Sequence, residues 1–371
     1  MTLIFVVIFV ALAFEYINGF HDTANSIATV VATKVLTPRQ AVVMAAVTNL
    51  IGALWGTAVA KTIASGLVQT QVVTQEVLVC ALLGAIVWNL ATWYWGLPSS
   101  SSHALIGGLV GAAVAAADSV QVVIWSQPSK GAWYDGKGLL WKVFIPMFSS
   151  PLAGFLLGMV VMGFLYFLLR NWKPHWVNQT FGKAQMASAA GMGFMHGTND
   201  AQKTMGIIAL ALAAGTADGS LNNTPGWLDF LHTPSPAPGH DLEIATWIKI
   251  TCALVMAAGT AGGGWRIIKT LGHKMVRLQP VHGFAAETTS ASIIGLASHF
   301  GIPVSTTHIA SAAIMGVGAA KRFNAVKWTV IEKMIWAWIL TIPISAAIAY
   351  GLVKLLLAIG WMSIVAVRLP G

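Results

Sequence analysis

Long apolar stretches without charge restrict the fold of this chain more than any other feature. Residues 143–169 form a run of 27 residues that contains no charged side chain. About 20 predominantly apolar residues are enough to span the hydrocarbon core of a bilayer. Charged residues make up 9% of the chain and mean hydropathy is +0.73, whereas a soluble domain carries about a quarter charged residues. Because the apolar runs are continuous and do not alternate, helices are favoured over a β-barrel. We therefore predict an all-α, polytopic membrane protein in contact with the lipid bilayer.

The net charge of +9 is explained by basic cytoplasmic loops, and we expect no nucleic-acid partner. Cys80 and Cys252 both lie inside apolar stretches and in no metal-ligand motif, so neither a disulfide framework nor a metal site is predicted from them. The first apolar run contains Glu15 and lacks a basic leader and a cleavage motif. We predict that it is retained as a helix.

The distribution of charge between the loops predicts the orientation in the membrane. The segment 215–243 is acidic and contains no Lys or Arg, so we place it outside the cell. The basic loops, which we place in the cytoplasm, are 34–39, 170–183, 266–277 and 321–333. The N-terminus is then predicted outside, in the inner (plasma) membrane of a cell. The predicted spans are 2–33, 41–60, 143–169, 184–214, 244–265 and 334–353.

Two further segments, 77–117 and 282–320, are predicted to be re-entrant hairpins. Each begins and ends on one side of the membrane, and its second arm is short for a full span. Their tips are Pro98–His103 and Pro303–His308. Each half then holds three spans and one hairpin, and an odd number of spans inverts the second half. This predicts an inverted repeat, which is common among secondary transporters: a first repeat at 1–170, a cytoplasmic linker at 171–183 and a second repeat at 184–371.

Matching motifs support the repeat. Gly19 and Asp22 correspond to Gly197 and Asp200 at an offset of 178, and the two hairpin tips correspond at an offset of 205. The glycines stand just before the polar clusters. We predict that they mark a break in the first spanning helix of each repeat.

The hairpin tips carry hydroxyl side chains directly behind a proline, which is a usual way to end one helix and begin another. At membrane depth the amides of a helix N-terminus need partners, and an anion is a suitable one. The alternative is that the hydroxyls only cap the helices; their recurrence at matching positions favours a tetrahedral-anion site. We assign Asn25 to this site together with six hydroxyl side chains: Ser100, Ser101, Ser102, Ser305, Thr306 and Thr307.

Two aspartates, Asp22 and Asp200, lie within long apolar stretches. An aspartate at the centre of a membrane helix costs about 2.5 kcal/mol or more on insertion scales, so each is a functional candidate. We assign both, with Asn199, to a coupling cation, either Na⁺ or H⁺; capping of half-helices is the alternative. Lys203 stands where the first repeat has Asn25. It is expected to balance Asp200, to contact the anion or to extend to the membrane surface, and its role is left open, as is that of Glu15.

Further titratable side chains are candidates for coupling. Glu287, on the first arm of the second hairpin, is assigned to the coupling ion, with hydrogen-bonded packing as the alternative. His21, His103 and His308 are candidates for a proton relay, and a structural role at the tips is the alternative.

The motifs quoted above resemble the inorganic phosphate transporter (Pit) family. The paired Gly-x-x-Asp elements, Gly-x-Pro-x-Ser-x-Ser-His in the first hairpin and Pro-Val-Ser-Thr-Thr-His in the second carry the resemblance over nearly the whole chain. The residues at 18–25 and 196–203 are similar to those of the bacterial low-affinity branch. The resemblance implies phosphate uptake by symport, an inverted-repeat fold and a homodimer, with no cofactor and no resident metal.

Two departures bear on the coupling ion. Many sodium-coupled members of the family have Asn before the first Asp, where this chain has His21, and Glu where it has Asn49. The branch resemblance favours protons, and it implies a neutral divalent-metal complex as an alternative form of the transported phosphate.

Three other functions compete with phosphate symport. A sulfate permease would use the same scaffold, because sulfate is also tetrahedral. A membrane lipid-pyrophosphate phosphatase would need an Arg beside the serines, and the chain has none between Arg39 and Arg170. A passive anion channel would not need paired intramembrane aspartates. We therefore predict a transporter and not an enzyme.

Overall fold

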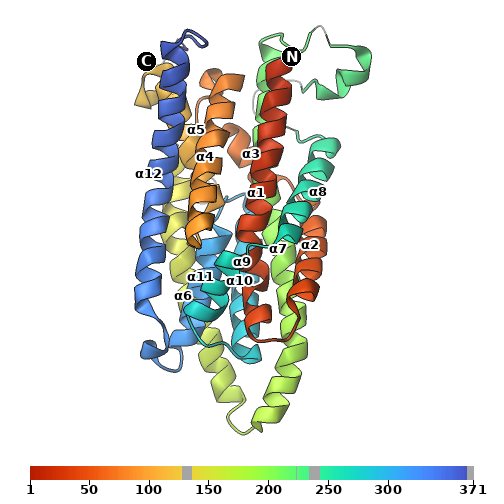
Figure 1. The fold of residues 1–371 in the computed structure, drawn as a ribbon, viewed down its shortest axis with the longest axis vertical. Helices are drawn as coiled ribbons and strands as arrows, with labels where there is room; N and C mark the ends of the chain where they lie inside the picture. Colours follow the sequence, from red (N-terminus) through yellow and green to blue (C-terminus); the bar gives the residue numbers. More distant parts are fainter. Residues whose placement is uncertain (128–135, 223, 234–242, 366–371) are drawn as a thin grey trace.

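The computed structural model describes residues 1–127, 136–222, 224–233 and 243–365, which form an elongated bundle of helices (Figure 1). Within these ranges no strand is present, and the extended backbone pairs at only two isolated bridges, Val68 with Val123 and Gln127 with Lys137. The prediction of an all-α fold is confirmed.

The same order of elements occurs in both halves: a long helix, a pair of helices separated by a short break, a helix–turn–helix unit and another long helix. The first half contains α1 (Thr2–Ala32), α2 (Pro38–Ala53), α3 (Ala58–Ser65), α4 (Gln75–Trp95), α5 (Ser101–Ala117) and α6 (Ile145–Leu168), with short turns η1 (Thr70–Val72), η2 (Val120–Val122) and η4 (Leu140–Phe144). The second half contains α7 (Pro174–Ala217), α8 (Thr246–Gly262), α9 (Trp265–Lys269), α10 (Pro280–His299), α11 (Thr306–Ala319) and α12 (Trp328–Ala358), with η5 (Gly226–Leu231), η6 (Thr270–Lys274) and η7 (Phe323–Ala325).

By length and composition, four helical segments of the described chain are suited to cross a membrane: 2–32, 75–95, 140–168 and 328–358. The pair α2 and α3 adds a fifth if counted as one span, although it is bent by 71°. The protein is thus a multi-pass membrane protein. Helix α7 does not meet these criteria because a polar, buried segment around Asp200 and Lys203 occupies its middle. That 184–214 forms a span remains a prediction.

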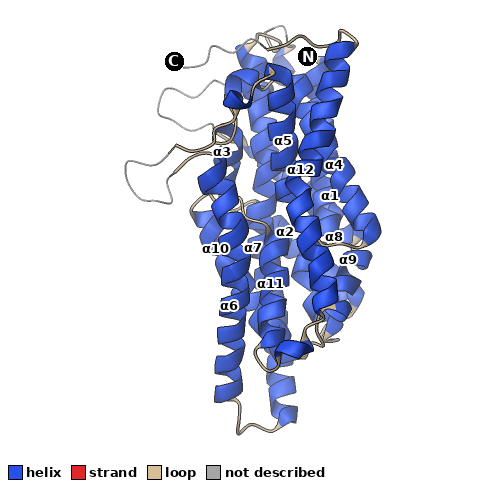
Figure 2. Ribbon diagram, turned by 90° about the vertical axis from the view of Figure 1, so that its left-hand side faces the viewer, coloured by secondary structure: helices blue, strands red, loops and turns tan. Residues whose placement is uncertain are grey.

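Each helix–turn–helix unit has the form expected of the predicted hairpins. Helix α4 ends at Gly96, which adopts the left-handed conformation (φ 66°), and Ser100 caps α5 by accepting from the His103 amide at 3.2 Å. Ser305 caps α11 in the same way, through the His308 amide. Figures 1 and 2 show α4 and α5 in the upper part of the molecule and α10 and α11 in the lower part. The two tips therefore approach each other from opposite ends.

The predicted break in the first helix of each repeat is wrong. Helix α1 continues through Gly19 and α7 continues through Gly197. Both glycines instead allow a close helix crossing. A Cβ atom at Gly19 would lie 2.5 Å from the Met256 carbonyl oxygen on α8, and one at Gly197 would lie 2.3 Å from the Asn49 carbonyl oxygen on α2. The interruptions lie in the second helix of each half, between α2 and α3 and between α8 and α9.

Most of the predicted cytoplasmic linker at 171–183 is helical. Helix α7 begins at Pro174, a residue whose fixed φ and missing N–H suit the first helical position. Figure 1 shows the ends of α6 and α7 extending together beyond the rest of the bundle. Of the predicted acidic loop at 215–243, residues 223 and 234–242 lie outside the described residues; Asp218 caps the end of α7 and Asp229 lies in η5.

The close crossing at Gly197 predicts the effect of a small substitution. Gly197→Ala should lower the Tm of the purified protein, because forcing a methyl group into a packed backbone contact costs about 1–3 kcal/mol. Gly191 is the matched control: it lies on the same helix, and a Cβ atom there would meet nothing within 4 Å. Gly191→Ala should leave Tm unchanged or raise it, since alanine is the better helix former. Thermal unfolding in detergent measures both, and equal Tm values for the two variants would contradict the packing argument.

Candidate functional site

The middle of the bundle is polar, and four elements meet there. The hairpin tips contact each other where the Ser102 hydroxyl donates to the Val304 carbonyl at 3.3 Å. Asp22 of α1 and Asp200 of α7 lie beside the tips, and both are buried. Residues about 80 to 280 positions apart in the sequence are thereby brought into one site.

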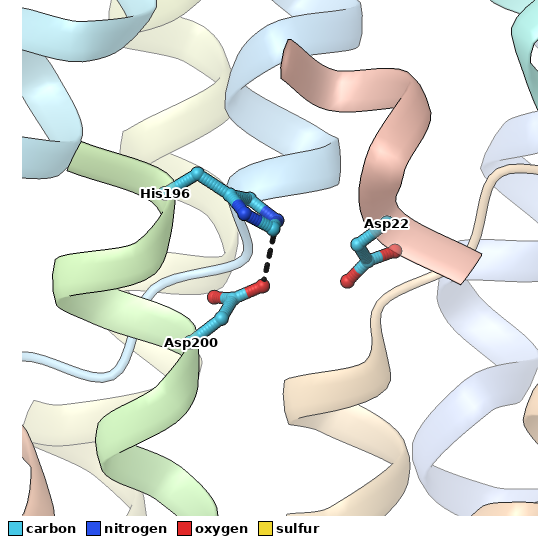
Figure 3. Close-up of side chains that lie close together, drawn as sticks. All are labelled: Asp22, His196 and Asp200. Carbon is cyan, nitrogen blue, oxygen red and sulfur yellow. Dashed lines mark ion pairs between the residues drawn. The ribbon is translucent and has the colours of Figure 1, made fainter. Parts of the chain in front are cut away.

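The two aspartates face each other, with His196 beside them (Figure 3). One ligand atom of each of Asp22, His196 and Asp200 lies within 4.8 Å of the other two. His196 is one helical turn before Asp200, and its Nε2 is 3.1 Å from Asp200 Oδ2. We call Asp22 and Asp200 the carboxylate pair.

The second hairpin tip supplies a hydroxyl donor to each member of the carboxylate pair. Thr306 donates to Asp200 Oδ2 and Thr307 donates to Asp22 Oδ1, both at 3.1 Å. Asn25 Nδ2 donates to Thr307 at 2.9 Å and to Thr306 at 3.3 Å. The predicted site residues Asn25, Thr306 and Thr307 are thus hydrogen-bonded into one network with both aspartates.

The first hairpin tip reaches the same network through Lys203. The Lys203 ammonium donates to Asp200 Oδ1 and to the Ser102 hydroxyl. It also donates to the Val304 carbonyl at 3.2 Å. Because the side chain is only 2% exposed, Lys203 does not extend to the membrane surface, and it balances the charge of Asp200.

The six tip hydroxyls divide into three groups. Ser100 and Ser305 cap α5 and α11, as the capping alternative expects. Ser102, Thr306 and Thr307 bind other side chains of the site, and the buried Ser101 hydroxyl has no partner among the described residues. A buried polar atom without a partner is rare in native proteins and marks a place where a ligand or water is expected.

Two predicted coupling residues lie away from the carboxylate pair. Glu287 accepts from Thr29 on α1 and from Gln185 and Ser188 on α7. Thr29 is two helical turns beyond Asp22, which corresponds to about 10 Å along the axis. The Asn199 amide donates to Ser298 at 2.9 Å and to the Ile302 carbonyl at 3.4 Å, at the end of α10.

The three predicted relay histidines have different surroundings. His21 Nδ1 is 2.8 Å from Asp22 Oδ1, and its Nε2 is 3.1 Å from Thr92 Oγ1, so it belongs to the site. His103 and His308 contact each other edge to face, with ring centroids 4.9 Å apart, and His308 stacks on Trp338. The rings of His103 and His308 make no hydrogen bond to the carboxylate pair in the described part of the chain.

Two residues of the site were not assigned from the sequence. His196 was missed, although its spacing of four residues from Asp200 places both on one helix face. Glu15 accepts from the Thr204 hydroxyl, one residue after Lys203, while its Oε1 atom has no partner in the described chain. Glu15 lies on α1 and His196 lies on α7, the two helices that carry the repeated Gly-x-x-Asp motif.

The electrostatics of the site favour a bound cation. Two ionised carboxylates whose oxygens lie within 4.8 Å repel by about 3 kcal/mol at an effective dielectric constant of about 20. Lys203 offsets the charge of Asp200. Asp22 receives both of its donors, His21 and Thr307, on Oδ1, and Oδ2 accepts no hydrogen bond from the described residues. A cation or a proton at Asp22 would remove the remaining negative charge.

Comparisons with known proteins identify the family. The model of the phosphate transporter family matches residues 18–178 and 169–349. This chain belongs to the phosphate transporter family. The membership confirms the resemblance found in the sequence and the prediction of a transporter over an enzyme.

Curated relatives align over most of the chain. A protein of Bacillus subtilis (strain 168) is 40% identical over 361 residues, covering 96% of this chain and 98% of its own. One of Rhizobium meliloti (strain 1021) is 42% identical over 341 residues and 92% of each chain. One of Mycobacterium bovis is 43% identical over 354 residues, 95% of this chain and 78% of its own. Each is named a probable low-affinity inorganic phosphate transporter.

A solved structure shares the fold. It is titled "The sodium-dependent phosphate transporter", and it superposes with a TM-score of 0.77 over 97% of this chain and 100% of its own. The sequences are 22% identical. This likeness supports the all-α architecture described above.

The division of the tip hydroxyls predicts opposite effects on stability for neighbouring serines. Ser100→Ala should lower the unfolding free energy by about 1 kcal/mol, because an N-cap is lost. Ser101→Ala should leave it unchanged or slightly raised, because the lost hydroxyl has no protein partner and alanine favours the helix. Thermal unfolding in detergent without added anion measures both. A larger loss for Ser101→Ala than for Ser100→Ala would show that the Ser101 hydroxyl is a structural group.

Proposed function

We propose that this protein imports inorganic phosphate across the cytoplasmic membrane by cation symport. One observation carries the proposal: two hydroxyl-bearing helix N-termini converge on a pair of buried aspartates. The family membership and the names of the relatives support phosphate as the substrate.

The hairpin tips supply groups that bind an oxyanion. The first amides of α5 and α11 have no partner within their own helices, and the partial positive charge of a helix N-terminus attracts anions. Beside them lies the unpartnered Ser101 hydroxyl, a buried donor. Phosphate bound between the tips would therefore meet donors from both halves of the chain.

The carboxylate pair supplies the reason for coupling. Phosphate carries one or two negative charges near neutral pH and would enter beside Asp22 and Asp200, where Lys203 offers a single fixed positive charge. Like charges at such distances in a buried site repel strongly. Phosphate binding is then favourable only if a cation or a proton binds with it, which is the thermodynamic basis of symport.

The same carboxylates favour phosphate over sulfate. Monohydrogen and dihydrogen phosphate carry protons that a carboxylate oxygen can accept as hydrogen bonds. Sulfate carries no proton at neutral pH and would meet only repulsion from an ionised aspartate. A sulfate permease remains the second candidate function on this scaffold. Inhibition of phosphate uptake by added sulfate tests it directly.

For the coupling ion we favour H⁺. His21, which stands beside Asp22 in place of the Asn of many sodium-coupled members, gives Asp22 a titratable partner. Na⁺ is the alternative, because carboxylate and hydroxyl oxygens bind it and the similar solved structure is titled sodium-dependent. A divalent ion carried with phosphate would find Asp22, His196 and Asp200 within reach, so the metal–phosphate complex is retained as a third form of the substrate.

We also propose the predicted topology and assembly. The N-terminus lies outside the inner membrane, the two halves have inverted orientations, and the protein is a homodimer. The opposed hairpins support the inversion (Figures 1 and 2), and the family resemblance supports the dimer. Labelling of single cysteines placed at each end of the bundle tests the orientation, and light scattering of the detergent-solubilised protein tests the dimer.

The decisive experiment follows ³²P-phosphate uptake into liposomes that contain the purified protein. Inward gradients of H⁺ and of Na⁺ are imposed separately, with sulfate as competitor and with or without a chelator of divalent metals. We expect concentrative uptake with the H⁺ gradient, little competition by sulfate, and loss of concentrative uptake in Asp22→Asn. Lys354→Asn is the matched control, since Lys354 pairs with Asp118 at the surface.

Each other result has a defined meaning. Uptake driven only by the Na⁺ gradient would mean that the coupling ion is Na⁺ and not H⁺. Loss of uptake on chelation would identify the metal–phosphate complex as the substrate. Uptake indifferent to both gradients would contradict symport. Accumulation of labelled sulfate without uptake of phosphate would show that the substrate is sulfate and not phosphate.

The anion-binding role of the tips predicts a change in apparent affinity. Ser101→Ala should raise the phosphate concentration at half-maximal uptake by about 10-fold or more, since a hydrogen bond to a charged group contributes about 1.5–3 kcal/mol. Ser311→Ala is the control and should leave the half-saturation unchanged. The Ser311 hydroxyl is also buried without a partner in the described chain, but it lies on the second turn of α11 and not at the hairpin tip. An unchanged half-saturation in Ser101→Ala, with normal uptake, would exclude Ser101 from the phosphate site.

A further inference from the structure

Lys203 occupies a pocket of oxygen atoms at the centre of the site. Its ammonium group contacts a carboxylate oxygen of Asp200, the hydroxyl of Ser102 and, at 3.2 Å, the carbonyl oxygen of Val304. Carboxylate, hydroxyl and carbonyl oxygens are also the ligands that hard metal cations such as Na⁺ take from proteins. The surroundings of Lys203 Nζ are therefore those of a cation-binding site.

All three donors of the ammonium group are in use. A lysine ammonium has three N–H groups, and the described residues offer three oxygen acceptors to Lys203. No donor is left for a phosphate oxygen unless one of these bonds breaks. This geometry favours charge balance over direct contact with the anion.

The two halves of the chain differ at this position. The residue of the first repeat that corresponds to Lys203 is Asn25, which is neutral and binds Thr306 and Thr307. Asp200 consequently has a fixed positive charge at its Oδ1 atom, whereas Asp22 is approached by His21 and Thr307 and by no lysine of the described chain. Only Asp22 is left with a charge that a mobile ion can balance.

We propose that Lys203 is a tethered cation that occupies, in the second half, the site of a dissociable coupling cation. The exchangeable cation then binds on the Asp22 side alone. This proposal rests on the proposed function, since a coupling cation is presupposed. According to this proposal, Lys203 determines how many cations accompany each phosphate. It predicts that a neutral residue at position 203 opens a second binding site for Na⁺.

The test counts bound cations directly. Purified wild-type protein and Lys203→Asn, which introduces the residue of the first repeat, are titrated with ²²Na⁺ at saturating phosphate in detergent. We expect the variant to bind one more Na⁺ per protomer than the wild type. NaCl, compared with choline chloride, should also raise the Tm of the variant by several degrees and leave that of the wild type nearly unchanged, because an ion that binds only the native state stabilises it.

Three further variants sharpen the test. Lys203→Gln gives a second neutral side chain, in case asparagine does not fold. Asp200→Asn combined with Lys203→Asn should lose the additional Na⁺, because the carboxylate that holds it is gone. Lys354→Asn removes a lysine from a surface pair and should bind as many Na⁺ ions as the wild type.

The outcomes separate this proposal from the proposed function. If both neutral variants bind no additional Na⁺, or are recovered as unfolded protein that NaCl does not rescue, the tethered-cation role is wrong. If they fold, bind no additional Na⁺ and show only a raised half-saturation for phosphate, Lys203 is an anion ligand. If wild-type liposomes take up no phosphate, the proposed function fails, while the ²²Na⁺ count still decides whether Lys203 fills a cation site.

Discussion

The burial of two carboxylates at the centre of an apolar bundle is the constraint on which the site depends. A charged group taken out of water is tolerated only when opposite charge and hydrogen bonds compensate it. Asp200 receives both kinds of compensation, from Lys203, His196 and Thr306. Asp22 receives hydrogen bonds but no fixed opposite charge. We propose that because of this difference Asp200 is a structural anchor, whereas Asp22 responds to a mobile cation.

The helix ends bring the compensating groups to this depth. A continuous helix satisfies its own amides in the membrane, so it has none to offer to a ligand. The breaks between helices at Pro98 and Pro303 place two helix N-termini in the middle of the bundle. Ser100 and Ser305 each accept a hydrogen bond from one amide there. The remaining hydroxyls are then free to bind side chains or an anion. The same short motif therefore both terminates a helix and builds a polar site.

Close packing of the long helices keeps this polar centre in place. At Gly19 and Gly197 the backbones of α1 and α7 come within contact distance of α8 and α2. Small residues permit such approaches, and close packing then holds the helices together. Thr23 adds a hydrogen bond to the Thr260 carbonyl on α8, and Thr198 adds one to the Gly52 carbonyl on α2. Three to six residues farther along, the same helices present Asp22, Asn25, Asp200 and Lys203. Glycine thus sets the position of the site by fixing how the helices cross.

The sequence by itself determined the fold class, the two hairpins and the elements that carry the site. Hydropathy and charge are local properties, and Pro-Ser-Ser and Pro-Val-Ser-Thr-Thr are local signals for a helix start. The recurrence of Gly-x-x-Asp also indicated which long helices correspond. Only the tertiary structure decided which side chains meet. Thr307 reaches Asp22, Lys203 reaches Ser102, and Glu287 joins Thr29 at a distance from the carboxylate pair. The glycines were misread as breaks because a glycine in a helix signals either flexibility or a close neighbour, and the neighbour lies elsewhere in the chain.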